Sequence, residues 1–474
     1  MKILKNYLYN TCFQIFVLIV PLITTPYISR VLGPKNVGIN TLTYAYTQYF
    51  VLIATLGLTL FGQREIAYLR DDKLKMSKGF WEIEILSVIT TVCSSILFLI
   101  FVIFIDRFRI YYCAQFFLIL SCAVDISWLF MGLEKFKITV LRNFIIKTLS
   151  VILIFTTVRN SDDLIKYILI ISVTTLLGNI SLWPYIKKYI VRVPFKQLKI
   201  FRHLRGTIAL FIPQIAISIY SVLNKIMLGQ FSSLNQTGFF DSSDKIIRLS
   251  LTLVTAFTTV MMPHVANAFV SKQYEKIKEF LNIGLWFSVF MSLPILTFII
   301  AISDEFVPWF FGQNFSPVSS VMKIEAVAIF PIACAGILGV QYLIPLNKNR
   351  LYTISILSGA VVNIIVNIPL ISYFNAEGAA LATVISEVCV TSLQFYFVRK
   401  NIMWRKLLMF LLKVLVASLF LFMTVTFESR YFSFSIFTFV VEGISGVCMY
   451  LLVAGLLNFN DLKDIFNKIL KGKK

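Results

Sequence analysis

The stretch TTPYISRVLGPKNVGINTLTYAY, residues 24–46, decides the fold of this chain. An apolar run ends at Arg30, the dipeptide Gly33–Pro34 follows, and a second apolar run begins at Ile39. Glycine adopts backbone dihedral angles that other residues avoid, and proline lacks the N–H group that a continuing helix needs. The stretch therefore predicts two apolar helices joined by a tight turn, with the permanent cation Arg30 about one helical turn before it.

A variant of this hairpin returns near the middle of the chain as NKIMLGQFSSLNQTG, residues 224–238. Lys225 takes the place of Arg30, Leu-Gly follows, and a glycine again opens a second apolar run. When the two hairpins are aligned, the seventh predicted membrane span corresponds to the first. Because six spans is an even number, both copies enter the membrane from the same face. The pattern predicts two parallel six-helix repeats, a plan that transporters use.

The composition is that of an integral membrane protein. Of the 474 residues, 58% are hydrophobic and 14% are charged, whereas soluble domains are about 45–50% apolar and about 25% charged. The mean hydropathy is +0.83. At about 20 residues for each spanning helix, the chain has room for about fourteen spans. We therefore expect an all-α integral membrane protein with fourteen transmembrane helices.

The apolar runs place these spans at residues 10–31, 39–61, 81–105, 110–131, 141–158, 166–186, 207–228, 245–270, 281–302, 321–345, 351–373, 378–398, 407–427 and 433–457. Fourteen spans return both termini to one side of the membrane. The loops on that side hold 31 Lys and Arg residues, and the loops on the other side hold 7. Because basic loops stay in the cytoplasm, both termini are predicted to be cytoplasmic.

The repeats divide the chain into three predicted parts. Residues 1–206 form an amino-terminal six-helix lobe with a basic linker, residues 207–403 form a second six-helix lobe, and residues 404–474 hold spans 13 and 14 and a cytoplasmic tail. The linker, residues 187–205, carries seven bases and no acid. Its apolar residues lie between the bases, which suits a helix on anionic membrane lipids. A simple topology anchor is an equally good interpretation.

The net charge of +21 does not indicate a nucleic-acid partner, because the bases lie in short loops between apolar runs. Catalytic chemistry is also poorly supported. The sequence lacks GxSxG, HExxH, Walker A and DxD signatures. The seven cysteines lie mostly inside apolar runs without CxxC spacing, so we predict no metal site and no disulfide framework. We expect a protein that is not an enzyme and needs no cofactor.

Several segments together resemble a known family. They are SRVLGPKNVG, GQREIA, NKIMLG followed by TGFFDSSDKI, MMPHVA, and NKNRLYTISILSGAVVNIIVNIPLI followed by NAEGAALATVISE. In order and spacing they are similar to the polysaccharide transporter family of Wzx-type lipid-linked oligosaccharide flippases, within the MATE-like multidrug/oligosaccharidyl-lipid/polysaccharide exporter superfamily. The resemblance covers nearly the whole chain. The family often has an acidic residue just before the lysine of NKIMLG, where this chain has Asn224, so no role for that carboxylate is carried over.

This resemblance implies a two-lobed fold that opens alternately inward and outward. It also implies the substrate, an undecaprenyl-diphosphate-linked oligosaccharide that crosses from the cytoplasmic to the external leaflet. Arg30, Lys225 and Arg248 suit such a diphosphate, since guanidinium binds phosphate oxygens in a fork and ammonium acts as a point charge. We expect these three cations to converge on one cavity. The alternative is that they reach outward to the lipid headgroups.

Four more charged residues are candidates for the transport cycle. Arg64 and Lys147, nearer the inner face, are candidates for receiving the diphosphate. Asp125 and Glu387 lie well inside their spans, where an unpaired charge costs roughly 2.5–3.5 kcal/mol on insertion scales. Either acid could bind H⁺ or Na⁺ and couple transport to an ion gradient. Pairing with a neighbouring cation, or a constantly protonated carboxyl, is the alternative for each.

The sequence thus predicts a bacterial cytoplasmic-membrane flippase that supplies capsule or O-antigen-like polysaccharide synthesis, with a polysaccharide polymerase as a further partner. Two other functions stay open. A MATE-type cation-coupled drug antiporter should line its cavity with acids and aromatic residues rather than with bases. A polytopic enzyme, such as a polysaccharide polymerase, should carry a long outer loop with clustered Arg, His or Asp.

Overall fold

A computed structural model describes residues 2–471 of the chain, and its described side chains are those of residues 16–457 except 17, 209, 210, 212–214, 216–221, 256 and 259. The described chain is helical, and it divides into two compact units, Met1–Gly229 and Gln230–Lys474. Each unit is considered by itself. The three-part division expected from the repeats, with boundaries at residues 206 and 403, stays a prediction.

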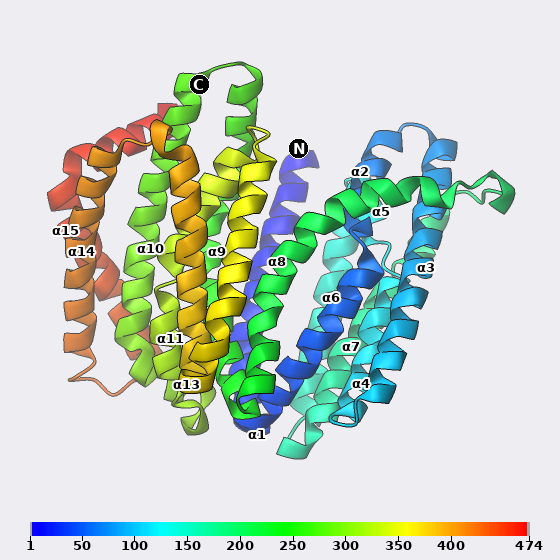
Figure 1. The fold of residues 1–474 in the computed structure, drawn as a ribbon, viewed down its shortest axis with the longest axis horizontal. Coiled ribbons are helices and arrows are strands. Elements are labelled where there is room, and N and C mark those ends of the chain that lie inside the picture. The colour runs from blue at the N-terminus through cyan, green and yellow to red at the C-terminus, as the bar shows by residue number, and fades with distance from the viewer. Residues whose placement is uncertain (1, 472–474) are drawn as a thin grey trace. The chain divides into compact units, whose positions relative to one another are not determined.

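The first unit is built from eight α-helices and four short 3₁₀ segments (Figure 1). The α-helices are α1 (Lys2–Thr55), α2 (Leu58–Leu69), α3 (Lys73–Phe104), α4 (Arg109–Cys122), α5 (Ser127–Gly132), α6 (Phe136–Thr157), α7 (Leu164–Ile180) and α8 (Leu204–Phe231), whose last two residues belong to the second unit. The 3₁₀ segments are η1 (Ser161–Asp163), η2 (Trp183–Lys188), η3 (Phe195–Gln197) and η4 (Ile200–His203).

The second unit holds seven further α-helices, a π-helical segment and two 3₁₀ turns. They are α9 (Leu234–Val270), α10 (Tyr274–Phe311), η5 (Gln313–Phe315), α11 (Val318–Ala326), α12 (Ile329–Ala335), the π-helix η6 (Gly336–Leu343), α13 (Asn349–Val398), η7 (Arg399–Asn401), α14 (Trp404–Glu428) and α15 (Ile436–Lys471).

Two of the long helices are interrupted by single residues with positive φ. Gly33 has φ 74° and ψ 169° inside α1, which confirms the predicted turn. Asn375 has φ 53° and ψ −126° inside α13. Beyond the second break, a Cβ atom on Gly378 would lie 2.0 Å from the carbonyl oxygen of Leu370, so only glycine permits this close approach. Each break reverses the chain with almost no loop.

By length and apolar composition, ten helical segments of the described chain could cross a membrane, or eleven if the bent helix α9 is one span. Two of these segments, Leu18–Leu69 with 52 residues and Asn349–Asn401 with 53, contain the breaks described above. Both are far longer than the roughly 20 residues that one crossing needs. The fold is therefore that of an all-helical membrane protein, as the composition predicted.

Three local predictions differ from the structure. Residues 229–244 were expected to form a loop, but α9 begins at Leu234, where the hydroxyl of Ser233 accepts a hydrogen bond from the Gln236 N–H at 3.4 Å. The fourth predicted span is confirmed as one candidate span, Arg109–Gly132, and differs only in being broken at residues 123–126 into α4 and α5. The basic linker forms 3₁₀ turns between residues 187 and 203 instead of a surface α-helix.

The first unit has a buried aromatic core, and its outer surface is apolar. Phe80 of α3 stacks on Trp128 of α5 with ring centroids 5.4 Å apart, and both side chains are buried. A Cβ atom on Gly62 would lie 2.6 Å from the Trp128 ring, so α2 and α5 pack closely there. Exposed large side chains such as Leu97 and Ile103 lie along α3, as expected for a helix that faces lipid.

Candidate functional site

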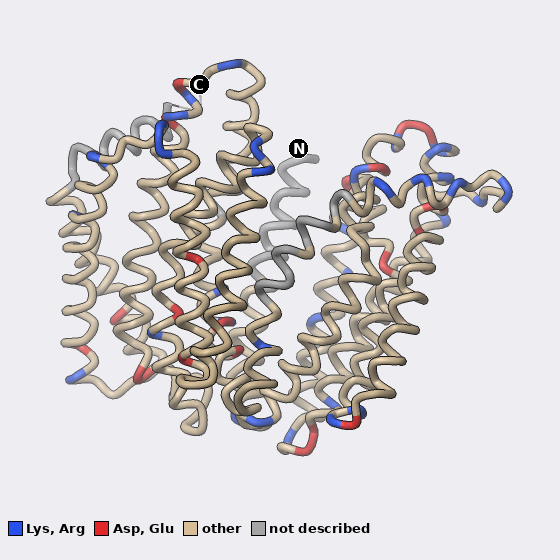
Figure 2. Tube along the Cα trace, in the orientation of Figure 1, with Lys and Arg blue, Asp and Glu red and all other residues tan. Residues whose placement is uncertain are grey.

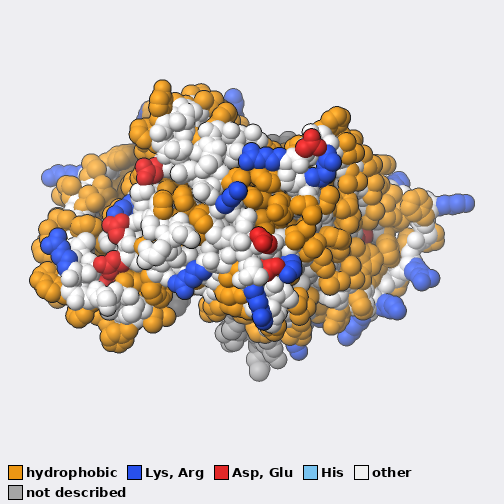
Figure 3. All heavy atoms as spheres, turned by 90° about the horizontal axis from the view of Figure 1, so that it is seen from below, with side chains coloured by type: hydrophobic (Ala, Val, Ile, Leu, Met, Phe, Trp, Pro, Cys, Tyr) orange, Lys and Arg blue, Asp and Glu red, His pale blue; other side chains and the backbone are white. Residues whose placement is uncertain are grey.

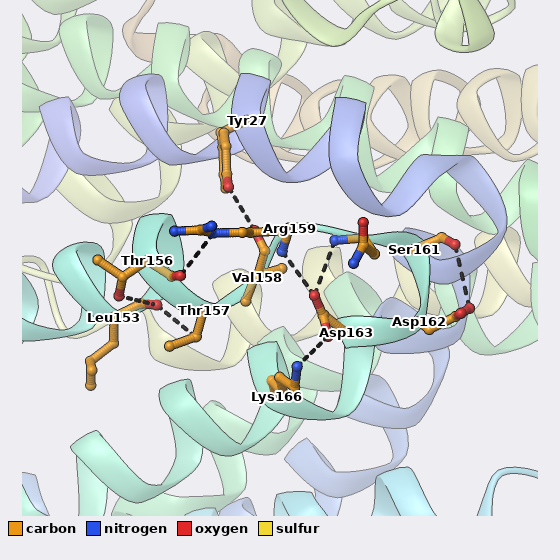
Figure 4. A network of polar contacts seen from close by, with 11 residues as sticks. Tyr27, Leu153, Thr156, Thr157, Val158, Arg159, Ser161, Asp162, Asp163 and Lys166 are labelled. Atoms are coloured by element: carbon orange, nitrogen blue, oxygen red, sulfur yellow. Dashed lines mark hydrogen bonds and ion pairs between the residues drawn. The ribbon is translucent and has the colours of Figure 1, made fainter.

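The candidate site begins at the break in α1, where Arg30 precedes Gly33 by one helical turn. The Arg30 side chain is exposed. One residue before Arg30 and one residue after it donate hydrogen bonds to the connection between α6 and α7. The Tyr27 hydroxyl donates to the Val158 carbonyl at 2.6 Å (Figure 4). The Asn36 amide donates to the Ser161 carbonyl at 2.8 Å. Helix α1 is therefore bonded to this connection once before and once after its break at Gly33.

The connection itself is held in shape by Asp163 (Figure 4). One oxygen of its carboxylate accepts the backbone N–H groups of Arg159 and Asn160 at 2.9 and 3.0 Å. The other oxygen lies 2.6 Å from the Lys166 ammonium. Because the two anchoring carbonyls belong to a loop with its own internal bonds, the loop can act as a fixed support for α1.

Lys225, the counterpart of Arg30 in the second hairpin, lies on α8 and is partly buried. One turn further along, a Cβ atom on Gly229 would lie 2.4 Å from the Leu42 side chain, so α8 packs closely against the second half of α1. The structure thus brings Lys225 and Arg30 into the same compact unit. Their convergence on one cavity stays a prediction.

Arg248 belongs to the second unit, on α9. Its Nε atom lies 2.7 Å from the Asp244 carboxylate one turn earlier, and 56% of its side chain is exposed. Lys245 makes the equivalent contact with Asp241, at 2.6 Å. The charge of Arg248 is therefore partly compensated by its own helix, which sequence reasoning did not foresee.

Arg64 and Lys147 are both exposed, on α2 and α6. The Arg64 guanidinium lies 5.5 Å from the centre of the Phe61 ring, within the range of a cation–π contact. Their predicted role in receiving the diphosphate stays a prediction.

Asp125 lies in the break between α4 and α5, partly buried, and accepts the Ser127 N–H at 3.0 Å. The broken backbone around it is satisfied from three other helices. Ser87 donates to the Cys122 carbonyl, Asn179 to the Ser121 carbonyl and Trp183 to the Val124 carbonyl, at 3.2, 2.9 and 3.0 Å. A buried helix break with every one of these carbonyls bonded is a built feature of the unit.

Glu387, the second candidate for ion coupling, lies partly buried on α13, within electrostatic range of Tyr352. The same helix buries Asn363 and Asn367, whose amide groups bond to each other at 2.8 Å. The structure places Asp125 in the first unit and Glu387 in the second. Coupling through either residue stays a prediction.

Sequence reasoning missed two sets of acids in the second unit. Asp241 and Asp244 are buried on α9, where a loop was expected, although their i,i+4 spacing to Lys245 and Arg248 is a helical signal. Next to them along α9, the Ser243 hydroxyl donates to the buried Glu325 carboxylate of α11 at 2.5 Å.

The second set lines a cavity of about 670 Å³ where α10 meets the connection between α14 and α15. Asp304, Glu305, Trp309 and Arg430 are among its lining residues. Asp304 binds the Lys323 ammonium at 2.5 Å. Glu305 differs from it, because one oxygen atom of its carboxyl group is buried and has no hydrogen-bond partner in the described chain. Among the described residues, no group of three or more His, Cys, Asp or Glu is arranged to hold a metal ion.

Family models match this chain over most of its length. The model described as polysaccharide biosynthesis protein matches residues 3–269, and the model described as lipid II flippase MurJ matches residues 140–444. The chain therefore belongs to the polysaccharide biosynthesis protein family, a family of membrane transporters and not of enzymes. This confirms the resemblance recognised in the sequence.

Individual relatives agree. A protein of Escherichia coli strain K12 named as an O-antigen transporter is 24% identical over 409 residues, covering 84% of this chain and 97% of its own length. Among solved structures, lipid II flippase MurJ in an inward closed conformation has a TM-score of 0.74, with 14% identity over 96% of this chain and all of that one. An inward-facing MATE family multidrug transporter has a TM-score of 0.67, with 14% identity over 81% of this chain and 93% of its own.

Proposed function

We propose that the protein is a flippase that moves undecaprenyl-diphosphate-linked oligosaccharide repeat units from the cytoplasmic to the external leaflet by alternating access. Two observations carry this proposal: membership of the polysaccharide biosynthesis protein family, and a fold that matches lipid II flippase MurJ over 96% of this chain and all of that one. The product would enter capsule or O-antigen-like polysaccharide synthesis. The E. coli relative named as an O-antigen transporter supports the bacterial cytoplasmic membrane as the location. A polysaccharide polymerase is proposed as a further partner.

The proposed topology has fourteen spans, both termini in the cytoplasm and two six-helix lobes followed by spans 13 and 14. The breaks in α1 and α13 support it, because each divides one long segment into two spans. The distribution of charge supports it as well. In Figure 2, the Lys and Arg residues of each unit, taken by itself, gather mainly in the connections at one end of its helices, as cytoplasmic loops should. Among the side chains seen from below in Figure 3, acidic residues accompany the basic ones.

In this mechanism the lipid tail stays in the bilayer while the headgroup crosses a hydrated path. A diphosphate cannot enter hydrocarbon unpaired, because the desolvation of its charges is too costly. Arg30 and Lys225 are proposed to supply the compensating charge, and Arg248 to join them once its contact with Asp244 loosens. Arg64 and Lys147 would bind the diphosphate on its way in. The two-point support of α1 favours Arg30 in this role, because a fixed helix segment places its guanidinium reproducibly.

The second candidate is a cation-coupled drug antiporter, which the MATE family structure at TM-score 0.67 favours. That function requires a path lined by acids and aromatic residues. The cations repeated at equivalent hairpins, Arg30 and Lys225, favour an anionic substrate instead.

Deletion of the gene tests the proposal. We expect lipid-linked repeat units to build up in the cytoplasmic leaflet of the deletion strain and to return to normal when the wild-type chain is supplied. Their sidedness can be measured by access of an added glycosidase in inside-out and right-side-out vesicles. Unchanged lipid-linked glycan with increased sensitivity to cationic drugs would show that the protein is a drug antiporter.

A further inference from the structure

Helix α3 buries two glutamates, two residues apart, in opposite surroundings. Glu82 is fully buried and accepts the Lys199 backbone N–H at 2.7 Å, the Arg202 guanidinium at 2.8 Å and the His203 imidazole at 2.9 Å. Glu84 is 2% exposed, and neither of its carboxylate oxygens has a hydrogen-bond partner in the described chain. A charged carboxylate without partners is strongly disfavoured in apolar surroundings, whereas the protonated form is tolerated. The pair therefore contrasts a buried carboxyl group that has three partners with one that has none in the described chain.

Glu84 has specific charged neighbours. Asp125, in the break between α4 and α5, lies within electrostatic range of Glu84. Arg142 of α6 lies within electrostatic range of Asp125 and donates through Nη1 to the Asn179 side chain at 3.1 Å. The Nε atom of Arg142 is buried and has no hydrogen-bond partner among the described residues. One cation with a spare donor thus lies near Asp125, and Asp125 lies near Glu84.

The other elements that pack against this part of α3 carry titratable groups that face elsewhere. The thiol of Cys122 on α4 faces Asp125. On η4, Arg202 and His203 are engaged by Glu82. From α1, Tyr46 packs against Phe101, more than four turns along α3 from Glu84. Helix α2 meets α3 through the apolar contact of Leu69 with Gly79. Asp125 is therefore the group whose charge acts on Glu84, and Arg142 acts on Asp125.

We propose that Glu84 is the proton-binding group of this transporter, and that it carries a proton in the arrangement described here. The negative charge of Asp125 favours the protonated form, since a second carboxylate close by disfavours ionisation. When the transport cycle opens Glu84 to water, the O–H bond breaks and the proton passes to water. The charged carboxylate that remains is then stabilised by hydration. Glu84 therefore binds one proton in the arrangement described here and none after the proton has been released. Its use as a driving force rests on the proposed flippase function, whereas the binding of the proton does not.

Dicyclohexylcarbodiimide tests the protonation of Glu84, because it modifies protonated carboxyl groups in apolar surroundings. Purified full-length protein in lipid nanodiscs is treated with the reagent over a range of pH, and the labelled peptides are quantified by mass spectrometry. We expect Glu84 to be labelled at neutral pH at least ten times more than Glu82, and the labelling to fall as pH rises. Glu82 is the internal control, because it lies on the same helix and is equally buried.

Two variants should shift the dependence of Glu84 labelling on pH in opposite directions. Asp125→Asn removes a negative charge, so Glu84 should lose its proton, and its labelling, at lower pH than in the wild type. Arg142→Gln removes the cation near Asp125, so the negative charge of Asp125 acts on Glu84 with less compensation and labelling should persist to higher pH. Size-exclusion chromatography confirms that each variant is folded before it is treated. Equal labelling of Glu84 and Glu82 would overturn the proposal, and so would an Asp125→Asn profile identical to the wild type.

Proteoliposomes that contain lipid-linked oligosaccharide separate this proposal from the proposed function. Translocation by the wild type should respond to an imposed pH gradient, and Glu84→Gln should remove that response. If the wild type translocates nothing while Glu84 is labelled as expected, the flippase function fails and the proton site stands. If translocation by Glu84→Gln responds to the gradient as the wild type does, Glu84 is not the coupling group.

Discussion

The hydroxyl group of Tyr27 donates a 2.6 Å hydrogen bond to the backbone carbonyl of Val158, which joins α1 to the connection between α6 and α7. The bond is made one helical turn before Arg30, and the Asn36 bond to Ser161 is made two turns beyond it. The position of Arg30 is therefore set by a loop that is 131 residues away from Tyr27 in the sequence. Substitutions in this support should act on Arg30 without removing its charge.

Tyr27→Phe removes the hydroxyl but keeps the ring, which packs against Phe155 with centroids 4.4 Å apart. We expect a loss of about 1 kcal/mol in stability, the usual net value of a hydrogen bond, and a reduced translocation rate. Thermal unfolding in detergent and translocation in proteoliposomes measure the two effects. Tyr68→Phe is the control, because Tyr68 is 73% exposed and should tolerate the change. Equal behaviour of both variants would show that the bond does not support Arg30.

Glu82→Ala should loosen the basic linker, because Glu82 accepts bonds from three successive parts of residues 199–203. Removing one partner of a buried charged group costs about 3–5 kcal/mol, and we expect the lower end because Arg202 is 46% exposed. The seven linker bases are trypsin sites, so cleavage there should be several times faster than in the wild type. Glu134→Ala, which removes an exposed partner of Arg70, should leave linker cleavage unchanged. Wild-type cleavage of Glu82→Ala would contradict this account.

Three glycines should respond differently to alanine. Gly33→Ala places a side chain at φ 74° and ψ 169°, a conformation that is essentially restricted to glycine, at a cost of about 1–3 kcal/mol. Gly378→Ala should be worse, because its Cβ would lie 2.0 Å from a backbone oxygen. Gly455→Ala meets nothing within 4 Å and should stabilise α15 by about 0.5–1 kcal/mol. The unfolding temperatures of the three variants in one detergent give the order of their stabilities. A Gly378→Ala variant as stable as the wild type would disprove the close packing at that break.

The turn at Gly33 could be predicted because its cause is local. Glycine, proline and the end of an apolar run stand next to one another in the sequence, and the fold keeps the turn they specify. The start of α9 could not be predicted in the same way. Ser233 to Asp244 are mostly small and polar residues, typical of a loop, and the helix forms because Asp241 and Asp244 pair with bases one turn later.

The candidate site could be predicted as a set of residue types but not as a set of contacts. Arg30 stood out because a cation at the end of an apolar run is rare. Its support by Val158 and Ser161 uses backbone carbonyls, which every residue has and no sequence pattern reveals. Glu82 and Glu84 look alike in the sequence. Their difference arises from the linker, which reaches one face of α3 and leaves the other face without partners.

The central claim is that Arg30 and Lys225 bind a diphosphate during translocation. The most direct measurement is the rate of lipid-linked oligosaccharide translocation by Arg30→Ala, Arg30→Lys and Lys225→Ala, with Lys35→Ala as an exposed control five residues from Arg30. A hydrogen bond to a charged group is worth about 1.5–3 kcal/mol, which corresponds to about a 10- to 100-fold loss for each alanine variant. Arg30→Lys should keep part of the rate, and Lys35→Ala should keep all of it. Wild-type rates in both Arg30→Ala and Lys225→Ala would contradict the claim.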